Sequence, residues 1–379
     1  MTRIAVLGAG RVGGAIARDL AATFEVTSVD RDAGRLDAMR REPGLGVLEA
    51  DLSDGAAVTR LAEDHDLVVS AVPGFLGLET LKAVIASGRD VVDISFFDGD
   101  PFALDDLARA RGVTAVVDCG VAPGLSHILL GHHARAWEVE DFECLVGGLP
   151  AKPEPPWLYR APFSPLDVLE EYTRPARLVE GGRPVTKPAL SDPELVRIEP
   201  VGELEAFLTD GLRTALRTMA VPGMREKTLR YPGHLAAIRA LRDGGFLSRE
   251  PVEVSGASVR PIDVAAALLL PAWRPEPGEE DLTVMRIRIR GREGPTAREV
   301  EWRLVDRTDP ITGTSSMART TGYTCTAVAR LLLSGRVPGP GIVAPETVGA
   351  AEGNLDRILD DLAARGVQLE REDGRISPA

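Results

Sequence analysis

A glycine-rich loop between an apolar run and a helical segment constrains the fold of this chain more than any other feature. Residues 4–7 are apolar, and the motif G-x-G-x-x-G follows, with its glycines at Gly8, Gly10 and Gly13. The first glycine of such a loop permits a tight strand-to-helix turn, the second lets the backbone approach a pyrophosphate, and the third lets the helix pack closely on the strand. The loop therefore predicts a βαβ unit that binds a dinucleotide at a helix N-terminus.

An acidic residue at the end of the next apolar run indicates which dinucleotide is bound. Asp30 closes the run 25–30, and a carboxylate at this place accepts hydrogen bonds from the adenosine ribose hydroxyls and repels a 2′-phosphate. NAD is therefore the expected cofactor. Arg31 leaves NADP open, because a guanidinium beside the ribose binds such a phosphate or stacks on the adenine.

Other cofactor contacts are expected within the glycine loop and after the strands that follow it. The small residues 71–73 come where the chain passes close to the nicotinamide, and Asp51 either flanks the adenine or caps a helix. Besides the three glycines, Asp30 and Arg31, the candidate cofactor residues are Arg11, Val12, Asp51, Leu52, Ala71, Val72 and Pro73.

Strand-like and helical segments alternate from the first residue to about position 118. The apolar, strand-like runs are 4–7, 25–29, 46–49, 67–72, 90–94 and 114–117. Between them, apolar residues recur at helical spacing, as Val12, Ile16 and Leu20 do. Because parallel strands need crossover helices, the alternation predicts an α/β fold with a doubly wound parallel sheet, whose ligand crevice lies at the carboxyl ends of the strands.

The pattern changes after about residue 130 and predicts a second, α+β domain with a mixed or antiparallel sheet. Residues 143–148 resemble a strand, and 283–290 and 299–307 alternate apolar and charged residues around a turn that contains glycine and proline. This alternation is typical of an antiparallel hairpin with one solvated face. The arginines of its first strand and the glutamates of its second are expected to pair across the strands.

Composition limits the partners and the compartment. A formal net charge of −13 argues against nucleic acid or an anionic membrane as the main partner. The longest apolar stretch, 264–270, is too short to span a bilayer, and no segment resembles a signal peptide. Cys119, Cys144 and Cys325 are odd in number and widely spaced, which indicates reduced thiols in a cytoplasmic protein and no metal site.

Several motifs in order along the chain resemble the saccharopine reductase and lysine 6-dehydrogenase family. Residues 226–234 read E-K-T-L-R-Y-P-G-H and resemble its T-L-R-Y-x-G motif. Residues 118–126 resemble D-x-G-x-x-P-G, in an Ala-Pro-Gly version closer to lysine 6-dehydrogenase. Three further stretches are similar, at 147–150, 317–322 and 343–346.

The resemblance implies an NAD(P)-dependent oxidoreductase that acts on a C–N bond of an amino acid. It implies a Rossmann domain at 1–127, a substrate-binding and dimerisation domain at 128–319, a C-terminal segment of about 320–379 that returns to the first domain, and a homodimer or higher homo-oligomer. The preferred substrate is L-lysine, oxidised at its terminal amine to the 6-semialdehyde. The alternatives are a saccharopine dehydrogenase, a carboxynorspermidine-type enzyme and a non-catalytic NAD-binding sensor.

The T-L-R-Y block supplies the first candidates for catalysis. Arg230 is the expected carboxylate clamp, because a guanidinium binds a carboxylate through two parallel bonds. The carboxylates of saccharopine would need further clamps, for which Arg225 and Arg160 are available. Tyr231 either orients the substrate or packs, and His234 either transfers protons or holds the turn.

Two strand ends supply the other candidates. Asp93 and Asp118 follow neighbouring predicted strands, where each carboxylate either attracts a substrate ammonium, polarises water or caps a turn. Cys119 lies beside Asp118 and is expected near the nicotinamide, or else in the core. His127 and the pair at 132–133 lack converging acids or cysteines at metal-ligand spacing, so no metal is predicted.

Overall fold

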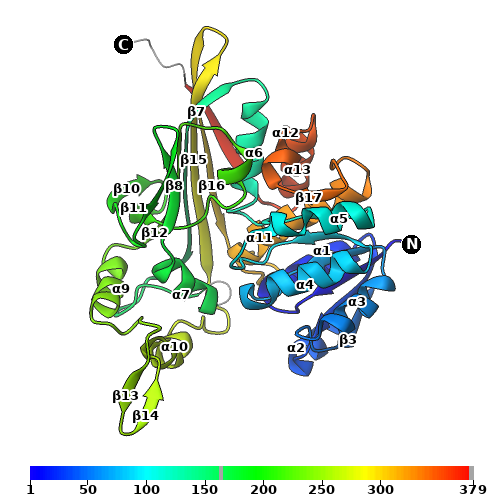
Figure 1. Ribbon diagram of the computed structural model, residues 1–379, viewed down its shortest axis with the longest axis horizontal. Helices are drawn as coiled ribbons and strands as arrows, with labels where there is room; N and C mark the ends of the chain where they lie inside the picture. The colour runs from blue at the N-terminus through cyan, green and yellow to red at the C-terminus, as the bar shows by residue number, and fades with distance from the viewer. Residues whose placement is uncertain (162–164, 375–379) are drawn as a thin grey trace.

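Two β-sheets organise the chain in the computed structural model, which describes residues 1–161 and 165–374. The first sheet is parallel and has the strand order β17-β6-β5-β4-β1-β2-β3 (Figure 1). Its strands are β1 (Arg3–Leu7), β2 (Glu25–Asp30), β3 (Leu45–Glu49), β4 (Leu67–Ser70), β5 (Asp90–Asp93), β6 (Thr114–Val116) and β17 (Gly341–Val343). The order reverses beside β1, so the predicted doubly wound sheet is confirmed.

Both faces of the first sheet are covered, so residues 4–7 of its inner strand β1 are apolar and buried. Ile4 and Val6 of β1 belong to one core together with Ile16 of α1, and Ala5 and Leu7 belong to a second core on the other face. Alternate residues of a strand point to opposite faces, so one short run serves both cores. The helices of this part are α1 (Arg11–Ala21), α2 (Ala33–Met39), α3 (Gly55–Glu63), α4 (Gly74–Ala86) and α5 (Asp105–Arg111), with a 3-10 turn, η1 (Pro101–Leu104).

The end of the chain contributes to both sheets. α11 (Ser316–Leu333) packs on α1, and β17 pairs with β6 at the edge of the first sheet. Two more helices follow, α12 (Pro345–Ala350) and α13 (Asn354–Ala363). The last strand, β18 (Leu369–Gly374), differs from the expectation for 320–379, because it pairs with β16 of the second sheet, where Leu369 lies opposite Leu304.

The second sheet has nine strands and is mixed, as predicted. Its main path is β10-β11-β12-β7-β15-β16-β18, with β8 beside β12 and β9 beside β8. The strands not yet given are β7 (Glu138–Pro150), β8 (Ala176–Glu180), β9 (Arg183–Lys187), β10 (Glu194–Ile198), β11 (Gly202–Leu208), β12 (Gly223–Arg230), β15 (Asp281–Glu293) and β16 (Thr296–Arg307). The predicted hairpin is β15–β16, in which Arg290 and Glu299 are opposite and form an ion pair of 2.7 Å.

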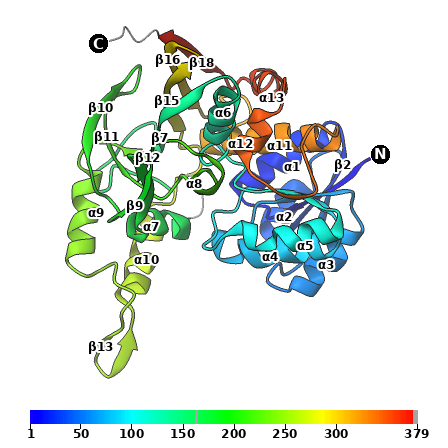
Figure 2. The same cartoon turned by 45° about the horizontal axis from the view of Figure 1, so that its top comes forward.

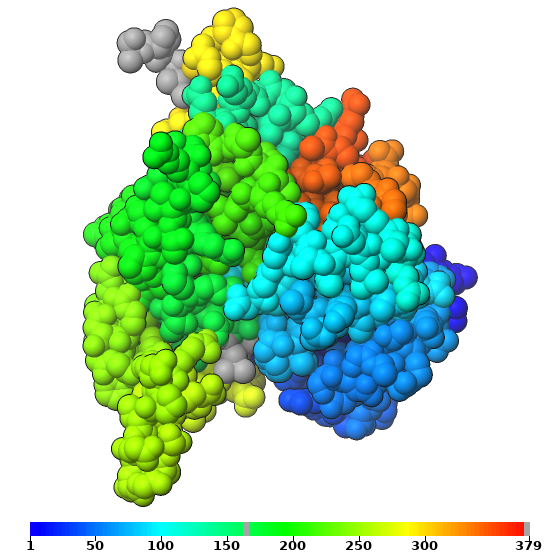
Figure 3. Space-filling view, viewed as in Figure 1, coloured from blue at the N-terminus to red at the C-terminus, as the bar shows by residue number. Residues whose placement is uncertain are grey.

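Helices join the two sheets and cover the second one (Figures 1 and 2). They are α6 (Leu125–Ala134), α7 (Pro165–Thr173), α8 (Ala215–Thr218), α9 (His234–Asp243) and α10 (Pro261–Ala272), and a small hairpin, β13 (Val252–Val254) with β14 (Ala257–Val259), projects before α10. Within the described part of the chain, no helix is both long and apolar enough to cross a membrane. In the space-filling view a notch separates the lower ends of the two parts of the molecule (Figure 3).

Candidate active site

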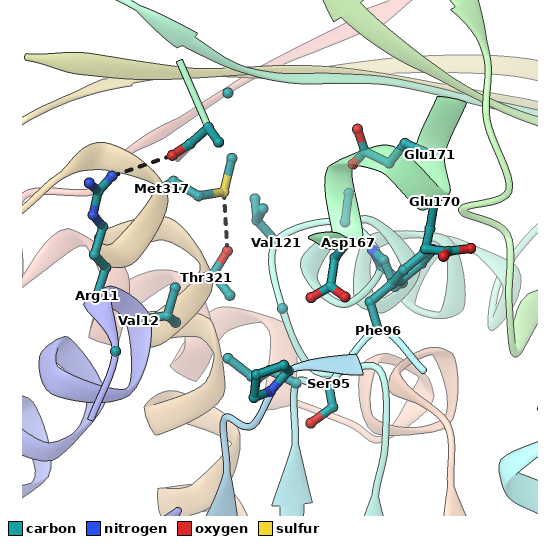
Figure 4. Close-up of a pocket in the computed structure, with 18 of the residues that line it drawn as sticks. Arg11, Val12, Ser95, Phe96, Val121, Asp167, Glu170, Glu171, Met317 and Thr321 are labelled. Carbon is teal, nitrogen blue, oxygen red and sulfur yellow. Dashed lines mark hydrogen bonds between the residues drawn. The ribbon is translucent and has the colours of Figure 1, made fainter. Parts of the chain in front are cut away.

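A cavity of about 700 Å³ lies between the carboxyl ends of the first sheet and the second sheet. Its walls come from the glycine loop, from the segments after β4, β5 and β6, and from β7, α7 and β12. Figure 4 shows Arg11 and Val12 on one side, and Asp167, Glu170 and Glu171 of α7 on the other. One continuous space therefore joins the predicted dinucleotide loop to charged side chains of the second sheet.

The glycine loop has the shape that a dinucleotide requires. Gly8 has a φ of +101°, and a Cβ there would lie 2.6 Å from the carbonyl oxygen of Ala71. A Cβ at Gly13 would overlap the carbonyl of Gly8, whereas a Cβ at Gly10 would meet no protein atom within 4 Å. Gly8 and Gly13 are thus needed for the fold, and Gly10 leaves space beside the start of α1 that fits a pyrophosphate.

The other predicted contacts of the loop also line the cavity. Val12 lies in its wall with the strand-end residues 71–73, and Arg11 donates a hydrogen bond to the carbonyl oxygen of Ala161 at 3.4 Å. These residues therefore lie together on the wall of the cavity into which the glycine loop opens.

Asp30 is held by backbone groups at the end of β2. Its Oδ2 accepts from the amide of Ala9 at 2.8 Å and its Oδ1 from the amide of Asp32 at 2.9 Å. Arg35 lies 3.5 Å from Oδ2 and lines the cavity, so it is a cation beside the ribose position that sequence reasoning missed. The i, i+3 spacing from Asp32, the N-cap of α2, to Arg35 is the signal that would have indicated it.

Three other predicted cofactor residues do not line the cavity. Asp51 is exposed, and its Oδ1 accepts from the amide and hydroxyl of Ser53 within a turn. The residue that caps α3 is Asp54, so the capping alternative for Asp51 is wrong. Leu52 is buried in the second core of the first sheet. Arg31 is exposed beyond the end of β2.

Strand alternation on β12 decides which residues of the T-L-R-Y block reach the cavity. Glu226, Thr228 and Arg230 line it, and the residues between them point to the other side of the strand. Tyr231 accordingly packs in a separate core and donates from its hydroxyl to the carbonyl oxygen of Pro150 at 3.1 Å. The structure does not place it at the substrate.

Arg225 also points away from the cavity. Its guanidinium binds Asp141 and Glu143 of β7, both at 2.8 Å. The structure therefore does not bring the predicted second clamp to the substrate end, because Arg225 lies an odd number of residues from Arg230 on the same strand. Arg160, the other candidate clamp, pairs with Glu279 at 3.1 Å and does not line the cavity.

Arg230 is the buried cation of the substrate end, with 2% of its surface exposed. It donates to Glu171 at 2.8 Å, to the hydroxyl of Tyr172 at 3.0 Å and to the carbonyl oxygen of Leu229 at 2.9 Å. Its guanidinium also lies over the ring of Tyr159, 4.6 Å from the centroid. Because a guanidinium has more N–H groups than these bonds use, Arg230 retains donors for a ligand carboxylate.

His234 lies behind Arg230 and does not line the cavity. Its Nδ1 donates to the carbonyl oxygen of Trp157 at 2.7 Å, so its Nε2 accepts from Tyr172 at 2.8 Å. Burial and the charge of Arg230 lower the pKa of His234 to about 3. The ring is therefore neutral at ordinary pH and orients Tyr172 and Arg230; this geometry fits the turn-holding alternative better than proton transfer.

The two strand-end aspartates have different environments. Asp118 lines the cavity and pairs with Arg213 at 3.0 Å. Asp93 is fully buried behind the cavity wall, where its Oδ1 accepts from the Ser95 hydroxyl at 2.8 Å. Burial raises the pKa of Asp93 to about 7. Asp118 thus reaches the site and Asp93 supports the loop beneath it.

Cys119 belongs to the core and not to the cavity wall. It is fully buried, and burial raises the pKa of its thiol. The thiol is therefore protonated and apolar in character, which is the core alternative for this residue.

The acids and one arginine of α7 and its C-terminal end are functional candidates that sequence reasoning missed. Asp167, Glu170, Glu171 and Arg174 line the cavity. Among the described residues, Nη1 of Arg174 has no hydrogen-bond partner, and its guanidinium lies 5.0 Å from the ring centroid of Phe96. The spacing of these residues at i, i+3, i+4 and i+7 is the one-face pattern of a helix, so the signal was present, but no motif marked it.

Glu226 is the other missed residue. It is 5% exposed, lines the cavity, and its Oε2 has no hydrogen-bond partner within the described chain. Across residues 1–161 and 165–374, no group of three or more His, Cys, Asp or Glu side chains is arranged to hold a metal ion.

Comparisons with known proteins agree with this architecture. Residues 4–116 match the family model of the saccharopine dehydrogenase NADP binding domain, and residues 120–367 match that of the saccharopine dehydrogenase C-terminal domain. Together these matches span both sheets and the cavity between them.

Curated relatives and a solved structure show the same similarity over most of the chain. An NADP(+)-dependent, L-glutamate-forming saccharopine dehydrogenase of Schizosaccharomyces pombe is 22% identical over 87% of this chain and 89% of its own. Its counterpart in Saccharomyces cerevisiae is 23% identical over 90% of this chain and 93% of its own. The apo structure of the latter organism's L-Glu-forming saccharopine dehydrogenase superposes with a TM-score of 0.79, at 22% identity, over 99% of this chain and 100% of that one, so the fold is the same.

Proposed function

The chain belongs to the saccharopine dehydrogenase family of NAD(P)-dependent oxidoreductases, and we propose that it oxidises the C–N bond of an amino-acid amine of the saccharopine type. The family resemblance carried by the sequence motifs is thereby confirmed. The observation that carries the proposal is the single cavity in which the glycine loop, the loop after β6 and the Arg230–Glu171 pair meet. A substrate held there lies within reach of a bound nicotinamide.

The charges at the substrate end support an amino-acid substrate with both carboxylate and ammonium groups. Arg174 and Arg230 offer free N–H donors to carboxylates. Asp167, Glu170 and Glu226 offer acceptors to an ammonium. Saccharopine is a secondary amine that carries several carboxylates, and the names of the curated relatives favour it as the substrate.

L-lysine oxidation at the terminal amine is the second candidate. The carboxylates that line the cavity are Asp118, Asp167, Glu170, Glu171, Asp210 and Glu226. Among the described residues, three arginines from the second part of the molecule line the cavity with them, namely Arg174, Arg230 and Arg274. This excess of acids suits a substrate with more ammonium than carboxylate groups, which favours lysine or a polyamine precursor such as carboxynorspermidine over a polyanion.

The cofactor is a nicotinamide dinucleotide, and we propose NAD in preference to NADP. Asp30 and Asp32 lie together at the ribose end, and Arg35 is shared between them at 3.5 Å and 3.3 Å. The local charge therefore does not favour a 2′-phosphate. The names of the curated relatives specify NADP(+). The activity test therefore compares NAD with NADP.

The test is the absorbance of the reduced dinucleotide formed from NAD or NADP at mildly alkaline pH. The substrates are saccharopine, L-lysine, L-ornithine and carboxynorspermidine, each without added keto acid. The proposal predicts turnover of saccharopine, faster with NAD than with NADP. Turnover of lysine alone would establish the second candidate, and binding of NAD without turnover of any amine would indicate a sensor.

A further inference from the structure

One carboxyl group at the substrate end, that of Glu226, forms no ion pair with an arginine in the described part of the chain. Glu226 follows Met224 and precedes Thr228 on the inner face of β12, where it lines the cavity and is 5% exposed. Its Oε2 has no hydrogen-bond partner in the described part of the chain. A buried carboxyl without a partner is costly to the fold, so its retention in a ligand cavity points to a role toward the ligand.

Three neighbouring carboxylates are paired with arginines. Glu171 binds Arg230 at 2.8 Å, Asp210 binds Arg177 at 2.8 Å, and Asp118 binds Arg213 at 3.0 Å. These acids come from α7, from the segment after β11 and from the loop after β6. Within the described chain, none of the three arginines forms a hydrogen bond or ion pair with Glu226.

The backbone is also shaped around this side chain. A Cβ at Gly211 would overlap the carboxylate of Glu226, so the segment after β11 passes close to this carboxyl. On the adjacent strand β7, Cys144 is in register with Glu226 and is fully buried. The carboxyl is therefore buried among backbone and neighbouring side chains, with the cavity on its remaining side.

This enclosure sets the proton affinity of the group. Burial, together with the negative charges around it, raises the pKa of Glu226 to about 8. The charged and titratable groups that face it are Glu171, Asp210, Asp118, Arg213 and Cys144. A carboxyl that changes protonation near the working pH is suited to general acid–base catalysis.

We propose that Glu226 is the catalytic base that takes the proton from the reacting ammonium nitrogen of the substrate. In this step an N–H bond of the ammonium breaks and an O–H bond forms on the carboxylate, at Oε2. No electron is transferred, and the product is a neutral amine whose lone pair assists loss of hydride from the adjacent carbon. The bound dinucleotide supplies the hydride acceptor. This inference rests on the proposed C–N oxidation, but it is the same for the secondary amine of saccharopine and the primary amine of lysine.

The direction of the pH effect follows from the geometry. Below about pH 8 the carboxyl is protonated and unable to accept a proton, and above it the carboxylate is available. The oxidation rate therefore increases with pH through this region, provided that Glu226 carries the proton. Removing the group removes that increase.

The experiment compares wild type with Glu226→Gln, Glu226→Asp and the matched control Glu203→Gln. Glu203 lies on neighbouring β11, is exposed and does not line the cavity. The pH profile of kcat/KM is measured with the best amine of the panel. We expect Glu226→Gln to lower kcat/KM by about 10²–10⁴-fold and to lose the rise near pH 8, Glu226→Asp to restore part of both, and Glu203→Gln to match wild type.

A second measurement follows the proton itself, without turnover. Titration calorimetry in two buffers of different ionisation enthalpy counts the protons released when saccharopine or L-lysine binds in the presence of NADH, which accepts no hydride. Wild type should release about one proton at pH 7 and far fewer at pH 9, and Glu226→Gln should release none at either pH.

The two proposals fail in different ways. Wild-type protein that oxidises no amine but still releases the proton overturns the proposed function and keeps Glu226 as the ammonium-facing group. An active wild type whose Glu226→Gln variant is folded and keeps the same pH profile and the same proton release overturns the role of Glu226.

Discussion

The two ends of the cavity are formed by different parts of the polypeptide, one mainly by backbone and the other mainly by side chains. The dinucleotide end consists of backbone: a left-handed Gly8, a Gly13 without room for a Cβ, and the start of α1. The substrate end consists of side chains, above all Glu226, Arg230 and those of α7, which come from segments about 60 residues apart. The first end is specified by a local run of sequence, and the second exists only when distant elements assemble.

The difference affects what each end tolerates. A backbone site depends on the absence of atoms, so a single methyl group disrupts it. A side-chain site depends on buried charges that neutralise one another. Loss of one partner therefore leaves the other as an unpaired buried charge, which destabilises the fold. Substitutions at the two ends should therefore fail by different routes.

The largest effect is expected at Gly13, and the matched control is Gly10. Gly13→Ala places a Cβ on the carbonyl of Gly8, which should cost about 3 kcal/mol of stability and abolish dinucleotide binding. The Cβ that Gly10→Ala adds meets no protein atom, and its φ of −68° is permitted for alanine. This variant should therefore have the thermal stability of wild type but bind NADH about 100-fold more weakly. Thermal unfolding and NADH fluorescence titration separate the two. Equal stability of both variants would contradict the backbone description of this end.

Arg230 tests the side-chain end. Arg230→Ala leaves Glu171 without its partner, so we expect a loss of about 3 kcal/mol in stability and a fall in kcat/KM of about 10³-fold. Arg230→Lys keeps the charge but loses the bond to Tyr172, and should recover stability more than activity. Urea unfolding and steady-state kinetics measure both quantities. If Arg230→Ala retains full stability, the buried pair does not hold this end together.

The sequence predicted the backbone end well and the side-chain end poorly, for a physical reason. A glycine loop is a contiguous signal, and six strands of the first sheet and the β15–β16 hairpin followed from periodicity. Arg225 and Tyr231 lie beside or within the T-L-R-Y block, but each is an odd number of residues from Arg230 and therefore points to the other face of the strand. Glu226 lies in the same block, two alternations from Arg230, but no motif marks it, because its burial depends on α7 and on the segment after β11.

His234 should affect the substrate end moderately and through position alone. Glutamine can keep the bond to Trp157 or the bond to Tyr172, but not both in the same geometry, so His234→Gln should lower kcat/KM about tenfold with an unchanged pH profile. If the pH profile of kcat/KM for His234→Gln instead lost a pH-dependent step near 6.5, the result would support proton transfer by His234.

The same residue makes a prediction for acid stability. Because the pKa of His234 is about 3 in the folded protein and ordinarily 6.5, the unfolded chain binds the proton more readily. Folding stability therefore falls as the pH drops from about 6.5 toward 3, by up to about 1.4 kcal/mol per pH unit. His234→Gln should reduce this slope in urea unfolding, and His65→Gln, which lies outside the cavity, should not.

The smallest effect is expected on the outer face of β12. Arg225 bridges Asp141 and Glu143 with about a third of its side chain exposed, so Arg225→Ala should cost about 1 kcal/mol of stability and leave kcat, KM and the pH profile within twofold of wild type. Glu226 is the next residue along the strand, and its substitution is expected to change all three kinetic quantities. A large rise in KM for Arg225→Ala would mean that the substrate contacts both faces of β12. That result would contradict the description of the substrate end as side chains on the inner face of this strand.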